Sequence, residues 1–193
     1  WTELTYTKAE ALDGESSGWV NSGDISLSGI TGSGYIGFKY VGSGNLANLD
    51  GQIQLDDIVI GGGNVGSADF IFFDDFEDCT TDYEIPSNFI EAIVAGAKTD
   101  RGWGCRAFGE GGGRAPRASA FGGADGMDNA WLITASKINL SSVSTAFLSM
   151  DINSAFPGDG DLKAHWSENY SGSGDPTSAN WTELSDFTSQ LPT

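Results

Sequence analysis

The chain has 193 residues, of which 39% are hydrophobic, so it can bury the core of one domain of ordinary size. Its 27 acidic and 9 basic residues give a net charge of −18, which argues against binding to nucleic acid or to an anionic membrane surface. No apolar segment approaches the roughly 20 residues that a membrane-spanning helix needs, so we expect no membrane insertion. The 28 glycines favour many short strands joined by turns.

Strand patterns separated by polar turns occupy the first part of the chain, residues 1–61. We predict strands at residues 1–6, 19–27, 35–40 and 52–60, with a turn at residues 21–24 that interrupts the second of them. In the last strand, strict alternation places two sets of side chains on opposite faces: Ile53, Leu55, Asp57 and Val59 on one face, and Gln52, Gln54, Asp56 and Ile58 on the other.

A glycine-rich segment at residues 62–67 follows this strand. Residues 61–66 match the pattern G-x-G-x-x-G, which in dinucleotide-binding proteins precedes a helix whose N-terminus binds the pyrophosphate. Here the next segment is Phe70-Ile71-Phe72-Phe73, a strand pattern, so we exclude dinucleotide binding. We interpret residues 62–67 as a linker between residues 1–61 and residues 68–193.

The second part of the chain also consists mainly of strand patterns. We predict strands at residues 70–73, 131–134, 146–152, 162–167 and 181–187, and one helix at residues 87–97 with Ser87 as its N-cap. A glycine-rich stretch contains five of the nine basic residues, either as a basic loop or as a contact surface for an acidic neighbour: Lys98, Arg101, Arg106, Arg114 and Arg117. Because regular helices are scarce, we predict an all-β fold, an antiparallel β-sandwich.

The tetrapeptide Trp1-Thr2-Glu3-Leu4 recurs as Trp181-Thr182-Glu183-Leu184, at an offset of about 180 residues, the size of one ordinary domain. We interpret the chain as one period of a repeating sequence plus a short overlap, although a chance match between two edge strands is the alternative. Residues 1–61 are then the C-terminal half of one module, and residues 68–193 are the N-terminal half of the next.

Four motifs follow one another in the second part of the chain: Phe76-Glu77-Asp78-Cys79; Trp103-Gly104-Cys105; Asp128-Asn129-Ala130-Trp131-Leu132-Ile133-Thr134 followed by Ile138-Asn139-Leu140; and Trp166-Ser167-Glu168-Asn169-Tyr170-Ser171-Gly172 followed by Trp181-Thr182-Glu183-Leu184. Together they resemble the bacterial choice-of-anchor J modules, which are similar to cleaved-adhesin and MAM-like modules. The resemblance implies a jelly-roll β-sandwich on a secreted or surface protein. The family elements that match residues 19–27, 36–40 and 55–58 normally follow the Trp-Thr-Glu-Leu strand but precede it here, so the order is permuted.

Cys79 and Cys105 are the only cysteines. A composition typical of secreted proteins favours a disulfide between them, whereas free thiols are the alternative for a cytosolic protein. Catalysis has little support, because the single histidine, His165, is accompanied by no Ser or Cys nucleophile motif and by no zinc-binding spacing. We therefore predict no catalytic residues and no enzyme.

The resemblance also implies a structural calcium ion, because jelly-roll modules often hold one where the first and last strands of the module meet. Glu77, near the first strand, and Asp56 or Asp57, in the last, would supply carboxylate oxygens. Asp128 and Asn129 are further candidate ligands. Solvated turn carboxylates with no bound ion are the alternative.

Aromatic side chains that stack on sugars are a second kind of candidate site. Trp131 and Trp166 lie in strands with a core-like pattern, so we predict that they are buried. Trp103, in the glycine-rich stretch, and Tyr170, before a Ser-Gly loop, are predicted to be exposed and able to bind glycans. Packing in the core or under a loop is the alternative role for both.

These observations favour a non-enzymatic, extracellular structural or adhesive repeat, or a filament subunit, whose partners are other copies of itself. Half a sandwich leaves open strand edges and an exposed apolar face. We therefore expect residues 1–61 of one copy to complete residues 68–193 of the next, head-to-tail, by strand complementation. Closure within one chain is the alternative arrangement, and a carbohydrate-binding module of a secreted enzyme or surface protein is the alternative function.

Overall fold

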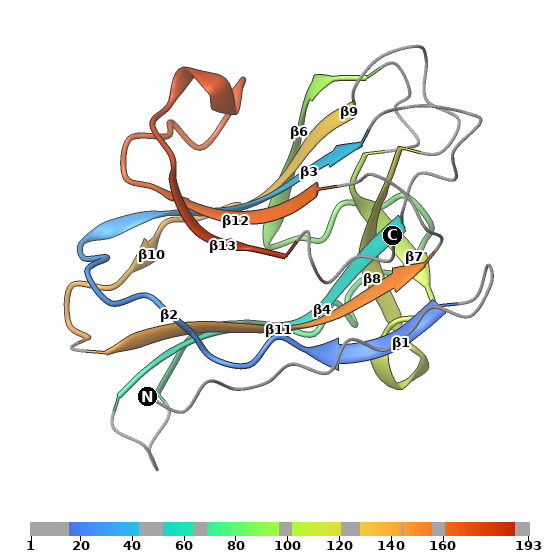
Figure 1. The fold of residues 1–193 in the computed structure, drawn as a ribbon, viewed down its shortest axis with the longest axis horizontal. Helices are drawn as coiled ribbons and strands as arrows, with labels where there is room; N and C mark the ends of the chain where they lie inside the picture. Colours follow the sequence, from blue (N-terminus) through green and yellow to red (C-terminus); the bar gives the residue numbers. More distant parts are fainter. Residues whose placement is uncertain are drawn as a thin grey trace.

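Two antiparallel β-sheets lie face to face in the computed structural model of the chain (Figure 1). The structure describes residues 16–42, 52–63, 69–96, 102–120, 128–143, 145–155 and 161–187. The prediction of an all-β, antiparallel sandwich is confirmed. Within the described ranges, no helix is long and apolar enough to cross a membrane.

Seven strands form one sheet and six form the other. The first sheet contains β1 (Ser16–Asn21), β2 (Ile25–Ser26), β4 (Gln52–Gly62), β5 (Asp69–Asp74), β7 (Gly104–Ala107), β8 (Arg114–Ser119) and β11 (Ala146–Ala155). Its order is β1-β11-β4-β8-β7, with β2 on β11 and β5 on β4. The second sheet contains β3 (Ser33–Gly42), β6 (Phe89–Ala95), β9 (Asp128–Thr134), β10 (Ile138–Asn139), β12 (Asp161–Ser167) and β13 (Thr182–Asp186). Its order is β13-β12-β3-β9-β6, with β10 on β3.

The main core fills the space between the sheets. β3 shows how the sequence produces it, because Ile36, Phe38 and Tyr40 occupy every second position and are almost fully buried. Tyr35, which precedes Ile36, belongs to a second, smaller apolar cluster on the opposite face of the same sheet. The chain that follows β12 rises over that face in Figure 1 and includes the short 3-10 helix η2 (Pro176–Ser178).

A β-bulge in β4 changes the predicted alternation of its side chains. The pairing with β11 shifts between Ser149 and Asp151, and Asp57 adopts a φ of 45° there. The extra residue reverses the faces beyond it, so Ile58 and Ile60, rather than Val59, join the core. The predicted set that included Asp57 and Val59 is therefore wrong after Leu55.

The described part of the predicted helix, residues 87–96, contains no helix. It contains the strand β6 (Phe89–Ala95), which pairs with β9 along the edge of the six-stranded sheet. The aromatic and β-branched residues of this segment suit a pleated surface, which explains why the strand prevails over a possible N-cap at Ser87. The described part of the glycine-rich stretch, residues 102–120, contains β7, the short 3-10 helix η1 (Glu110–Gly112) and β8.

The two parts of the chain interleave within one sandwich. β3 from the first part lies between β9 and β12 of the second, and β4 pairs with β5, β8 and β11. Gly62 pairs with Asp69, so the predicted linker joins two neighbouring antiparallel strands. A short connection of this kind keeps both strands in one sheet. The single chain thus differs from the expected arrangement, in which the two parts belong to different sandwiches.

The second copy of the repeated tetrapeptide leads into β13, which pairs with β12 at the edge of the six-stranded sheet. The first copy, at residues 1–4, lies outside the described residues.

Candidate functional site

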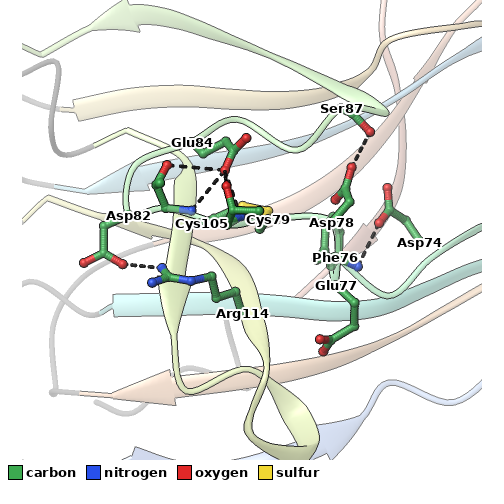
Figure 2. The surroundings of a disulfide bond; sticks show 12 residues. Asp74, Phe76, Glu77, Asp78, Cys79, Asp82, Glu84, Ser87, Cys105 and Arg114 are labelled. Atoms are coloured by element: carbon green, nitrogen blue, oxygen red, sulfur yellow. Dashed lines mark hydrogen bonds and ion pairs between the residues drawn. A yellow bond between two sulfur atoms is a disulfide. The ribbon is translucent and has the colours of Figure 1, made fainter.

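A disulfide between Cys79 and Cys105 fixes the loop after β5 to strand β7, as predicted (Figure 2). Both cysteines are almost fully buried. The backbone reinforces this link, because Tyr83 N donates a hydrogen bond to Cys105 O at 2.9 Å, and Cys105 N donates one to Glu84 O at 2.7 Å. The Glu84 carboxylate in turn accepts a hydrogen bond from the Thr80 backbone N–H at 2.9 Å. The loop is therefore held by covalent and polar contacts together.

Some of the basic residues in the glycine-rich stretch form ion pairs with an acidic residue of the same chain. Arg114 and Arg106 both pair with Asp82, the latter at 3.4 Å, and Figure 2 shows the Asp82–Arg114 contact beside the disulfide. The Arg114 guanidinium hydrogen-bonded to Asp82 lowers the pKa of that carboxyl group. Lys98 and Arg101 lie outside the described residues. Two of the five basic residues thus pair with the chain's own Asp82.

Three of the predicted calcium ligands, Asp56, Asp57 and Glu77, lie close enough to influence one another, and we call them the acidic group. Asp56 is only 2% exposed, and its two carboxylate oxygens accept hydrogen bonds from Asp57 N at 2.9 Å and Glu110 N at 2.7 Å. Burial raises the pKa of Asp56 to about 7, against the opposing effect of these hydrogen bonds. Burial also raises the pKa of Asp57, and repulsion from Asp151, Glu110 and Glu77 adds to the effect.

The other two predicted ligands lie elsewhere. Asp128 and Asn129 begin β9, in the opposite sheet from β4, where the Asp128 carboxylate lies against Gly96. The structure therefore does not join them to the acidic group. In the part of the chain that the structure describes, no three Asp, Glu, His or Cys side chains stand close enough together to hold a metal ion.

The two predicted glycan-binding aromatics are both buried. Trp103 is 3% exposed and Tyr170 is 2% exposed, so the prediction that they are exposed is wrong. The indole N–H of Trp103 donates to Ala130 O at 3.2 Å, inside the main core. The hydroxyl of Tyr170 donates to Gly174 O at 3.0 Å and so holds the loop that covers the six-stranded sheet. Both have the packing roles that were the alternative.

The smaller apolar cluster surrounds the repeated tryptophan of the second copy. Trp181 stacks obliquely on Trp131, with ring centroids 4.9 Å apart, and on Tyr170 at 5.4 Å. His165 packs against the same Trp131 at 5.1 Å, and burial lowers the pKa of His165. The predicted burial of Trp131 is confirmed, as is that of Trp166. His165 is half-buried rather than a fully exposed surface residue.

A polar pocket of about 530 Å³ was not predicted from the sequence. It lies where the loop before β3 meets the end of β12 and the start of β13, and we call it the Trp166 pocket. Its polar and aromatic lining residues are Thr31, Trp166, Glu168, Asn169, Asn180 and Thr182. These come from three separate segments, so only the fold brings them together.

The chain matches no protein-family model, and comparisons with curated proteins and with solved structures found no match. The class of protein is therefore defined by its own structure: an all-β protein of two antiparallel sheets with one buried disulfide.

Proposed function

We propose that this chain is a non-enzymatic, extracellular module with a structural or adhesive role, and that its copies associate head-to-tail by strand complementation. In this proposal the sandwich is a jelly roll of the choice-of-anchor J type with its strand order permuted. The buried disulfide supports a secreted or cell-surface location, because disulfides persist in oxidising compartments. The charge of −18 suits a protein that stays soluble outside the cell.

One observation supports association most directly: two segments of the chain have a sequence that fits the place of β13 at the edge of the six-stranded sheet. In β13 and just before it, Trp181 packs on Trp131, Glu183 pairs with Lys163 at 3.1 Å, and Leu184 packs against the main core. The motif Trp1-Thr2-Glu3-Leu4 repeats these side chains in the same order. Because β13 occupies this position in each sandwich, the first copy can bind there, in its own chain or in another, only by displacing β13.

The two copies of the repeated segment differ at the position that Phe187 occupies in the second copy. Phe187 is 1% exposed in the core, and its backbone N–H donates to Leu162 O at 2.8 Å. The corresponding residue of the first copy is Thr7, which cannot supply the same apolar burial. A chain's own β13 therefore has the advantage over the first copy of a neighbour. We expect association to be weak and to increase with protein concentration.

Light scattering over a concentration series tests the proposal. For the full chain, the mean mass should rise above that of one chain as concentration increases. Deletion of residues 1–7 should hold it at the mass of one chain, whereas deletion of residues 188–193, the matched control, should leave the rise intact. Phe187→Ala should increase association at a given concentration, because it weakens the competing strand.

An association that survives deletion of residues 1–7 would contradict strand complementation. The exposed aromatic pair on the edge strand β5 offers the main alternative contact, since Phe70 is 67% and Phe73 49% exposed. If Phe70→Ser/Phe73→Ser alone abolished association, the contact would lie on β5 instead.

We also propose that the acidic group binds a structural Ca²⁺ ion. Asp56, Asp57 and Glu77 offer the carboxylate oxygens that this ion prefers, and Glu110 and Asp151 add negative charge nearby. A buried carboxylate such as Asp56 with other carboxylates nearby is unfavourable without a counter-charge, which a divalent cation supplies. The side chains would turn toward the ion, because they do not converge on one point as they stand.

Calcium is expected to raise the melting temperature and EDTA to lower it. At a calcium concentration one hundred times the Kd, ligand binding adds about 2.7 kcal/mol, which corresponds to roughly 5–10 °C for a domain of this size. Differential scanning calorimetry should show this shift for the wild type and lose most of it for Asp57→Asn/Glu77→Gln. Asp24→Asn, at an exposed acid outside the group, should keep it. An identical melting curve in calcium and in EDTA would rule out the ion.

A further inference from the structure

The pairing of β12 with β13 is irregular at His165. The register between the two strands shifts between Ala164 and His165, so β13 has one residue more than β12 at this point. A bulge of this kind leaves the extra residue unpaired and interrupts the ladder locally. Strand exchange requires β13 to leave β12, and His165 therefore lies where the ladder that must open is already interrupted.

His165 also contacts the aromatic side chains that hold the start of β13. Its ring centroid lies 5.1 Å from that of Trp131, and Trp131 stacks on Trp181 at 4.9 Å. Both indole rings lie against β3, since a Cβ on Gly37 would be 3.0 Å from Trp131 and 3.1 Å from Trp181. Gly37 is the residue of β3 that pairs in register with His165. A change at the imidazole is therefore transmitted through Trp131 to the residue that precedes β13.

The imidazole occupies a position that suits its neutral form. Both ring nitrogens of His165 are buried, and neither has a hydrogen-bond partner among the described residues. The neutral ring leaves one N–H donor without an acceptor, whereas the protonated ring would leave two and would also bury a positive charge. Burial accordingly lowers the pKa of His165.

The charges around His165 come from three strands. Besides burial, Lys39 of β3 and Lys163 of β12 lower the pKa of His165, whereas Glu183 of β13 raises it. Glu183 is already paired with Lys163 at 3.1 Å, and Lys39 Nζ lies 5.6 Å from the ring centroid of Trp131. A protonated His165 would therefore share one carboxylate and one indole with two cations that are already there.

We infer that His165 is a pH-sensitive switch: protonation of its imidazole weakens the contact of β13 with its own sandwich and makes that place available to the first copy of the repeat in another chain. The inference rests on the proposed strand complementation. His165 is the only histidine of the chain, and histidine is the side chain that ordinarily changes its charge in mild acid.

The direction of the effect follows from the lowered pKa. A group that is harder to protonate in the folded state destabilises the fold once the pH falls below its ordinary pKa, which is about 6.5 for histidine. Asp56 and Glu91 act in the opposite direction, because burial raises the pKa of each to about 7. A test must therefore separate the opening of β13 from the stability of the whole sandwich.

Hydrogen exchange of the full chain makes this separation, at a concentration at which light scattering gives the mass of one chain. Mass spectrometry follows the amides of residues 182–187, which include the Phe187 N–H bonded to Leu162 O, and the amides of β3 report unfolding of the whole sandwich. From about pH 7.5 to about pH 5, the opening constant of β13 relative to β3, corrected for intrinsic exchange rates, should rise roughly threefold or more. His165→Gln and His165→Phe, which do not titrate, should show no such rise.

Three results would overturn the switch. In the first, β13 of the wild type opens equally at both pH values. In the second, it opens less in acid, as a dominant attraction between protonated His165 and Glu183 would cause. In the third, both variants show the same rise as the wild type.

Light scattering at high concentration separates the switch from the proposed function. If β13 opens in acid as expected but association does not need residues 1–7, strand complementation fails and the switch stands. If association needs residues 1–7 but wild type and His165→Gln associate equally at both pH values, the switch fails and strand complementation stands. Comparison at the same pH removes the effect of the lower net charge in acid, because both chains share their acidic residues.

Discussion

Trp103→Ala is expected to lower the free energy of unfolding by about 3–5 kcal/mol, the usual cost of removing a buried aromatic side chain from a core. The indole is 3% exposed and donates a hydrogen bond to Ala130 O, so the variant loses both packing volume and the partner of a buried carbonyl. Chemical denaturation followed by circular dichroism measures this change. Any loss of ligand binding in this variant would then reflect loss of the fold.

Two matched variants make the result interpretable. Phe70→Ala removes an aromatic side chain that is 67% exposed, and it should change stability by no more than about 0.5 kcal/mol. Trp103→Phe keeps most of the buried area but loses the N–H donor, so an intermediate cost is expected. If Trp103→Ala had the stability of the wild type, the packing described for the main core would be incorrect.

Removal of the disulfide is expected to have the second large effect. Cys79 and Cys105 are 26 residues apart, and closing a loop of about this length contributes roughly 3 kcal/mol in the chain-entropy model. Cys79→Ala/Cys105→Ala should be less stable by about this amount. Wild-type protein in dithiothreitol should lose a similar amount, because the loop after β5 is freed from β7 in both cases.

Thiol labelling provides the control for this prediction. Native protein from an oxidising compartment should contain no reactive thiol, and unfolded, reduced protein should contain two. Quantitative labelling of two thiols in the native protein would contradict the bridge.

Much of the fold follows from local patterns. β3 was predicted from its aromatic and β-branched residues, and β12 from the alternation of apolar and polar side chains over several positions. The bulge at Asp57 was not, because Asp56-Asp57 within an alternating strand gives no local sign that two residues oppose one across the sheet. β6 was assigned to a helix because a possible N-cap was given more weight than the β-branched residues after it.

The candidate sites depended even more on contacts that are distant in sequence. Asp56 and Glu77 were placed together through the family resemblance, and their electrostatic interaction in the structure is consistent with that placement. The burial of Trp103 could not be predicted, because a glycine-rich stretch offers no alternation that indicates a core position. The Trp166 pocket combines segments around Thr31, Asn169 and Asn180, which no sequence motif connects.

Strand complementation between chains is tested most directly by an intermolecular cross-link. In β13, Asp186 pairs in register with Lys163 of β12, and Tyr6 is the counterpart of Asp186 in the first copy of the repeat. Two proteins, one with Tyr6→Cys and the other with Lys163→Cys, would be mixed at high concentration under mild oxidation. A third protein with Ser173→Cys, at an exposed loop position, serves as the control partner for the Tyr6→Cys chain.

The account predicts a product with twice the mass of one chain for the Tyr6 and Lys163 pair, and little for the Tyr6 and Ser173 pair, on a non-reducing gel. Mass spectrometry should locate the new disulfide between residues 6 and 163 of different chains. Absence of that product, or equal yields for both pairs, would contradict strand complementation.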